Sequence, residues 1–111
     1  MFEILFTDEA LAIYKSLKEK ADKKSTKKVM KNSPVIGLFK QLKKTLCFLS
    51  QNPRHPGLRT HEYSAIQNPW HPKQKVFEAY VQNCTPGAYR LFWCYGPEKN
   101  QLTVITIIQH P

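Results

Sequence analysis

Residues 76–110, VFEAYVQNCTPGAYRLFWCYGPEKNQLTVITIIQH, contain three apolar segments separated by turn-forming residues. The segments run from Val76 to Val81, from Tyr89 to Tyr95 and from Leu102 to His110. β-Branched and aromatic residues dominate all three, which is typical of strands. The connections CTPGA and GPEKN are too short for a crossover helix, so consecutive strands are expected to pair antiparallel. This stretch therefore predicts the main part of an antiparallel sheet.

Upstream of these segments the pattern predicts two helices followed by one further strand. The strand is expected from Leu58 to Ile66, after the turn formers of residues 52–57. The helix before that turn is expected from Ser33-Pro34 to about Ser50, because serine caps helices well and proline is tolerated in the first turn. The earlier helix is expected from Ala10 to about Lys24, where Thr7-Asp8-Glu9 supplies a cap and two favourable acids.

Apolar residues recur three or four positions apart in both expected helices, so each should bury one face. The positions are Leu11, Tyr14, Leu17 and Ala21 in the first helix and Val35, Leu38, Phe39, Leu42, Leu46 and Leu49 in the second. A short strand from Phe2 to Phe6 opens the chain. The whole order predicts one α+β domain over residues 1–111: an N-terminal strand, two helices, then a four-stranded antiparallel meander, with the helices on one face of the twisted sheet.

The charge of the chain favours a polyanionic partner. The 111 residues include 17 Lys and Arg against 8 Asp and Glu, a net charge of +9, and the pI is about 9.6. All three arginines, Arg54, Arg59 and Arg90, lie in the second half. Because a guanidinium fork fits phosphate better than an ammonium group does, specific phosphate contacts are expected in that half.

Several classes of protein are excluded by what the motifs lack. Three cysteines without paired spacing argue against a secreted disulfide framework, and the N-terminus resembles no signal peptide, so we expect a cytoplasmic protein. Neither GxGxxG nor GxxxxGK[ST] occurs, and the His and Cys spacing matches no metal motif, so no cofactor or metal is expected. Cys94 lies in an apolar strand, where an inert packed thiol is the usual finding.

Four segments together resemble the RelE/ParE superfamily of small toxins from toxin–antitoxin pairs. They are LSQNPRHPGLRTH at 49–61, VFEAYV at 76–81, YRLFW at 89–93 and the final apolar strand to His110. The resemblance implies a RelE-like α+β fold and neutralisation by a cognate antitoxin protein. Many members are endoribonucleases that cut messenger RNA, often on the ribosome, whereas the ParE branch poisons DNA gyrase.

The resemblance also implies roles for three catalytic candidates. Arg90 matches the strand arginine that holds the scissile phosphate. His110 matches the terminal-strand histidine that acts as general acid, and His61 matches a histidine that serves as base or acid. Arginine and histidine side chains suit metal-free RNA cleavage, which needs a base for the 2′-OH, an acid for the departing 5′-oxygen and fixed positive charge. Histidine changes protonation near neutral pH and suits either proton-transfer role.

Three further residues are candidates for substrate binding. In an extended strand Arg59, His61 and Tyr63 share one face, which would present an arginine and a histidine together. Tyr63, like Trp70 and Tyr80, offers a ring on which a base can stack. Glu78 is an alternative base.

Residues 76–81 hold none of the lysines that one ribonuclease branch uses, so the histidine mechanism is the one expected. The leading hypothesis is a metal-independent ribonuclease toxin that cleaves messenger RNA, in association with the ribosome. A non-catalytic gyrase inhibitor and an inactive antitoxin-binding member are the alternatives.

Overall fold

The computed structural model describes residues 1–25, 34–82 and 87–109. In chain order the elements are β1 (Glu3–Phe6), α1 (Asp8–Ser25), α2 (Pro34–Gln51), the short 3-10 helix η2 (Pro56–Leu58), β2 (His61–Glu62), β3 (Phe77–Tyr80), β4 (Tyr89–Tyr95) and β5 (Gln101–Gln109). This order confirms the predicted α+β fold class and both helices. Ser33, the expected cap of the second helix, lies outside the described residues.

The strands form one five-stranded sheet in the order β1-β5-β4-β3-β2. Strands β2 to β5 pair antiparallel with their neighbours in the chain, as predicted for the meander. β1 lies along the other edge of β5 and runs parallel to it, with Glu3 opposite Gln101, so the complete sheet is mixed. A parallel neighbour needs a long connection, which the two helices between β1 and the meander provide.

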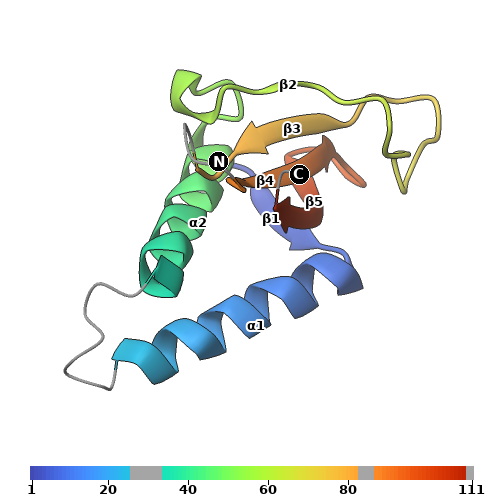
Figure 1. The fold of residues 1–111 in the computed structure, drawn as a ribbon. Helices are drawn as coiled ribbons and strands as arrows, with labels where there is room; N and C mark the ends of the chain where they lie inside the picture. The colour runs from blue at the N-terminus through green and yellow to red at the C-terminus, as the bar shows by residue number, and fades with distance from the viewer. Residues whose placement is uncertain (26–33, 83–86, 110–111) are drawn as a thin grey trace.

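Both helices lie on one side of the sheet and bury the core against it (Figure 1). The predicted apolar stripes supply the helix side of this core. Its principal members are Leu17 and Ala21 of α1, Leu42 and Leu49 of α2, and Leu91, Trp93, Leu102 and Val104 of the sheet. Alternate residues of a strand face opposite sides, so Leu91 and Trp93 in the core place Arg90 and Phe92 on the second face of the sheet.

Thr7 joins the first helix to the last strand. Its Oγ1 accepts a hydrogen bond from the backbone N–H of Ala10 at 3.1 Å, which confirms the predicted helix cap. The same hydroxyl donates to the carbonyl of Ile105 at 2.6 Å. The pairing of β4 with β5 shifts between Phe92 and Trp93, which leaves Ile105 outside the ladder. Thr7 therefore satisfies a carbonyl that the β-bulge leaves unpaired.

The strand expected from Leu58 to Ile66 is wrong except at His61–Glu62. Leu58 ends η2 and is fully buried, and Arg59 follows with a φ of 48°, in the left-handed region that strands do not use. Leu58 is therefore buried by a turn and not by a pleated sheet. After Glu62 the chain leaves the sheet and returns at Phe77.

The intervening loop, residues 63–76, is held by hydrogen bonds within itself and by a bond to the sheet. The Asn68 side chain accepts from the backbone N–H groups of Trp70 and His71, at 2.8 and 3.1 Å. The indole Nε1–H of Trp70 donates to Thr103 Oγ1 at 2.9 Å. Because Thr103 belongs to β5, this bond fastens the loop to the sheet.

Candidate functional site

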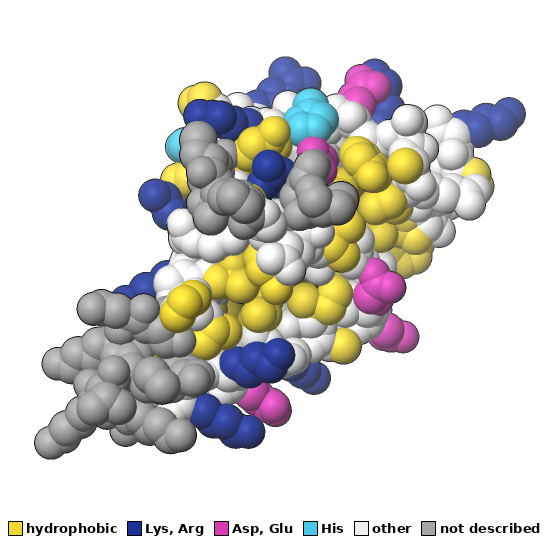
Figure 2. Space-filling view, viewed as in Figure 1, with side chains coloured by type: hydrophobic (Ala, Val, Ile, Leu, Met, Phe, Trp, Pro, Cys, Tyr) yellow, Lys and Arg dark blue, Asp and Glu magenta, His cyan; other side chains and the backbone are white. Residues whose placement is uncertain are grey.

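Polar and aromatic side chains cross the second face of the sheet, away from the helices. His61 on β2 is paired with Glu78 on β3, and Tyr80 on β3 is paired with Arg90 on β4. Directly paired residues, and residues two apart in one strand, share a face. We call these four residues, His61, Glu78, Tyr80 and Arg90, the polar row. Figure 2 shows histidine, acidic and basic side chains together over this part of the sheet.

A short contact joins the histidine of the polar row to its carboxyl group. Nε2 of His61 lies 2.6 Å from Oε1 of Glu78, and its Nδ1 lies 3.2 Å from the carbonyl oxygen of Arg59. A carbonyl only accepts, so Nδ1 carries a hydrogen in this arrangement, and the Nε2 contact requires another proton between the two groups. The Glu78 side chain is 8% exposed and that of His61 49%. The pair therefore holds a transferable proton at the solvent boundary.

Arg90 is held along one edge of its guanidinium group. Nη1 donates to the carbonyls of Gln82 at 2.8 Å and Tyr89 at 3.3 Å. Nε is buried and has no hydrogen-bond partner, and no acidic side chain of the described residues forms an ion pair with Arg90. Nε and Nη2 form the second edge of the fork, a pair of donors that matches two phosphate oxygens.

Tyr80 lies between the two functional groups. The Arg90 Cζ atom is 3.7 Å from the centroid of the Tyr80 ring, and the His61 ring meets the same ring edge-on at 6.0 Å. The tyrosine therefore sets the spacing between the guanidinium and the imidazole. Arg90, His61 and Glu78 were all expected from the sequence, whereas the linking position of Tyr80 was not.

The carbonyl of Gln82 is a positioning group that sequence reasoning missed. No residue pattern marks it, because the backbone of any residue at this position offers the same acceptor. Tyr63 is close to the polar row, but its ring is partly buried and packs on Phe92 with centroids 4.6 Å apart.

The expectation that Arg59 shares a strand face with His61 and Tyr63 is wrong. The left-handed backbone at Arg59 breaks the alternation, and its side chain lines a hollow together with Trp93, on the helix side of the sheet. Only its carbonyl reaches His61. His110, the third expected catalytic residue, lies outside the described residues, and β5 is described as far as Gln109.

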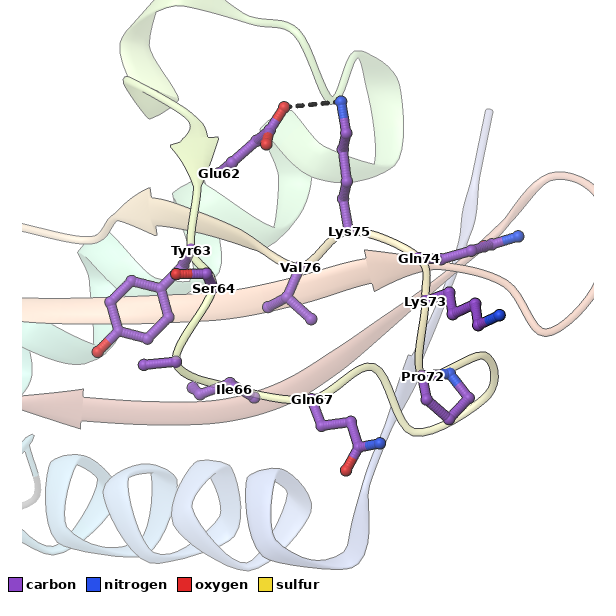
Figure 3. A pocket seen from close by; sticks show the side chains of 11 residues that line it. Glu62, Tyr63, Ser64, Ile66, Gln67, Pro72, Lys73, Gln74, Lys75 and Val76 are labelled. Carbon is purple, nitrogen blue, oxygen red and sulfur yellow. Dashed lines mark ion pairs between the residues drawn. The ribbon is translucent and has the colours of Figure 1, made fainter.

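A hollow of about 380 Å³ lies between the two arms of the loop formed by residues 63–76 (Figure 3). Glu62 and Lys75 form an ion pair of 2.8 Å between the arms. No imidazole or guanidinium group lines this hollow. Its size alone does not make it the reactive site, so we assign the candidate chemistry to the polar row.

Cys94 has the properties of a packed thiol. It is fully buried, and burial raises its pKa from the usual 9.0 to about 11. The thiolate is the reactive form of cysteine, so Cys94 is a poor nucleophile near neutral pH.

Within residues 1–25, 34–82 and 87–109, no three His, Cys, Asp or Glu side chains gather in a way that would hold a metal ion. None of the helices in this part of the chain has the length and apolar character needed to cross a membrane.

The fold matches solved structures of bacterial toxins. A YoeB/ParE toxin from Agrobacterium tumefaciens aligns with a TM-score of 0.61 and 8% identity, over 99% of this chain and all of the other. The YoeB dimer from Staphylococcus aureus aligns with a TM-score of 0.59 and 12% identity, over 99% of this chain and 98% of that one. The intact Escherichia coli RelBE toxin–antitoxin complex aligns with a TM-score of 0.57 and 16% identity, over 100% of this chain and 99% of that one.

No protein-family profile and no curated protein sequence matches the chain. The structural matches cover essentially the whole chain at low identity. The chain therefore has the fold of the RelE/ParE-type toxins, as the resemblance implied.

Proposed function

We propose that the chain is the toxin of a toxin–antitoxin pair and acts as a metal-independent endoribonuclease on messenger RNA. The observation that supports this most is the polar row, in which Tyr80 separates a proton-holding His61–Glu78 pair from the guanidinium of Arg90, whose Nε has no hydrogen-bond partner. Metal-free RNA cleavage uses those groups, a proton acceptor and a fixed cation for the phosphate. The shared fold with toxin structures adds support.

In the proposed reaction the guanidinium of Arg90 binds the oxygens of the scissile phosphate. The His61–Glu78 pair first loses one of the protons that it holds in the arrangement described above. In that form the pair accepts the proton of the ribose 2′-OH. The 2′-oxygen then bonds to phosphorus, and the bond from phosphorus to the 5′-oxygen breaks. The departing oxygen takes a proton from a general acid, for which His110 remains our candidate. The products are a 2′,3′-cyclic phosphate and a 5′-hydroxyl end.

The partners we propose follow from charge and fold. A net charge of +9 favours contact with RNA, and we propose that cleavage takes place on messenger RNA bound to the ribosome. One matching structure is a toxin–antitoxin complex. We propose that a cognate antitoxin neutralises this chain by covering the polar row. Since translation and messenger RNA are cytoplasmic, the proposed site of action is the cytoplasm.

Brief expression in bacteria that lack an antitoxin, followed by mapping of RNA 5′ ends, tests the proposal. The wild type should arrest growth and create new 5′-hydroxyl ends within messenger RNAs, and Arg90→Gln should do neither. Lys20→Gln is the matched control, because it removes one positive charge from an exposed site on α1. Growth arrest with intact transcripts and altered plasmid supercoiling would reject the nuclease in favour of gyrase inhibition. Harmless expression of the folded wild type would reject both.

A further inference from the structure

A hollow of about 370 Å³ lies on the helix side of the sheet, next to the turn that follows α2. Its walls come from residues 53–56, 59 and 60 and from three aromatic side chains, Phe77, Trp93 and Tyr95. We call it the turn cavity. Its volume is within the range of small-molecule sites. None of the polar-row residues lines it, so it is separate from the proposed catalytic site.

Two residues that line the turn cavity each have a buried side-chain polar atom without a hydrogen-bond partner. Among the described residues, the buried side-chain atoms without a hydrogen bond are Thr60 Oγ1, Trp93 Nε1, Arg90 Nε and Thr106 Oγ1. Arg90 and Thr106 face the second side of the sheet, whereas Thr60 and Trp93 line the turn cavity. Buried polar groups are usually paired, so these two are exceptions. Both atoms have almost no accessible surface, so the groups of this cavity that a ligand can reach are the exposed arginines and the half-exposed ring of Tyr95.

The polar side chains of the turn cavity favour an anion. Arg54 and Arg59 are exposed on its wall, and no acidic side chain lines it. Neither arginine forms an ion pair with any acid of the described residues. His55 Nδ1 accepts from the N–H of Gly57 at 2.9 Å, so the hydrogen of a neutral His55 ring is on Nε2. The arginine and histidine side chains that line the cavity thus carry hydrogen-bond donors and no carboxylate.

The aromatic side chains add a surface on which a flat ring can stack. The rings of Phe77 and Tyr95 have centroids 5.9 Å apart, and Tyr95 is 39% exposed. These two residues also line a neighbouring hollow of about 360 Å³, to which Lys73 and Lys75 contribute. The aromatic floor is therefore continuous between two hollows with basic rims. Aromatic side chains combined with cations are the usual means of binding single-stranded nucleic acid.

The backbone at Arg59 is a further sign of a constrained site. Its φ of 48° is uncommon for a residue other than glycine and is stabilised by the bond from its N–H to the Pro56 carbonyl at 3.2 Å. With this conformation Arg59 lines the turn cavity while its carbonyl contacts His61.

We propose that the turn cavity binds one nucleotide unit, with its phosphate at Arg54 and Arg59 and its base against Phe77 and Tyr95. The nucleotide is either free in solution or part of an RNA strand whose next nucleotide enters the neighbouring hollow. The proposal concerns binding alone and does not depend on the nuclease activity. Binding is therefore expected to persist in Arg90→Gln.

The indole N–H signals of ¹⁵N-labelled protein provide the test. Adenosine 5′-monophosphate and a short 2′-O-methyl RNA, which lacks the 2′-OH needed for cleavage, are the two probes. The Trp93 indole signal should shift, because Trp93 lines the cavity and stacks on Phe77, whereas that of Trp70, which is bonded to Thr103 and does not line the cavity, should not. Trp70→Phe assigns the two signals. Saturation by the mononucleotide identifies a free nucleotide as the ligand, and saturation by the RNA alone identifies a strand.

Arginine variants show whether binding is specific. Arg54→Gln removes one guanidinium, and Arg59→Asn removes the other with a residue that tolerates the left-handed backbone. Each should weaken binding roughly tenfold, as expected for loss of a charge-assisted phosphate contact, while Lys20→Gln should leave it unchanged. An unshifted Trp93 signal with both probes, or equal weakening by Lys20→Gln, would overturn the proposal. So would a shift caused only by an acidic peptide.

Discussion

Arg90 and Tyr80 face each other across β3 and β4, with the guanidinium carbon 3.7 Å from the centroid of the ring. Hydrogen bonds from Nη1 to two backbone carbonyls fix the guanidinium in this position over the ring. A guanidinium fixed in this way loses little further freedom when it binds a phosphate, because its orientation is already set. The geometry therefore favours phosphate binding over a mobile surface charge.

Arg90→Lys should reduce RNA cleavage by about a hundredfold, the size of effect seen when one oxyanion-binding donor is lost. Lysine keeps the charge but has no fork that can hold two carbonyls and a phosphate together. Tyr80→Phe preserves the ring under the guanidinium and is the control expected to retain activity. Single-turnover cleavage of a short RNA measures both variants. Full activity of Arg90→Lys would show that charge alone suffices.

His61 and Glu78 should behave as one unit. His61→Ala leaves a carboxyl group that is 8% exposed without its partner, which should lower the free energy of unfolding by about 1–3 kcal/mol. In Glu78→Gln the exposed histidine can form hydrogen bonds with water instead, so this variant should lower the free energy of unfolding by less than His61→Ala does.

A double-mutant cycle measures how strongly the two residues are coupled. In both cleavage rate and stability, the double variant should lose less than the sum of the single variants, because they share one interaction. Strict additivity in urea unfolding and in cleavage would contradict the pairing of His61 with Glu78.

Thr7→Val should destabilise the fold by about 1–2 kcal/mol, the usual range for loss of a helix cap. Valine keeps the shape but leaves both the N–H of Ala10 and the carbonyl of Ile105 unpaired. Thr7→Ser retains the hydroxyl and should stay close to the wild type in thermal unfolding. A Thr7→Val variant as stable as Thr7→Ser would show that the hydroxyl contributes nothing.

The two described thiols should differ strongly in reactivity. Cys47 is exposed and should be alkylated readily near neutral pH, whereas the buried Cys94 should resist in native protein. Labelling of a Cys84→Ser variant, followed by peptide mass spectrometry, separates the two. Equal labelling of both thiols in the folded state would contradict the burial of Cys94.

The raised pKa of Cys94 also predicts a pH dependence. Between pH 9.0 and about 11 the unfolded thiol loses its proton while the folded thiol keeps it. The stability associated with this proton is therefore present below pH 9.0 and decreases as the pH rises towards 11. Cys94→Ala should reduce this alkaline loss of stability, measured as the midpoint of urea unfolding at several pH values.

Much of the architecture is encoded in local pattern. The stripes around Leu17 and Leu42 and the cap at Thr7 define two helices, because both features act within a few residues. The three strands after residue 75 follow from β-branched and aromatic runs separated by turns that are too short for any other connection. Arg90 and His61 were candidates from their residue type and from the resemblance.

Tertiary structure decided the direction of β1, the turn at 56–59 and the grouping of the polar row. Leu58 is buried equally well by a strand or by a 3-10 turn, so its apolar character does not distinguish them. Likewise, no local signal places Tyr80 between His61 and Arg90, since that depends on the register of three strands. Local sequence determines which residues must be buried, whereas contacts between distant segments determine which functional groups meet.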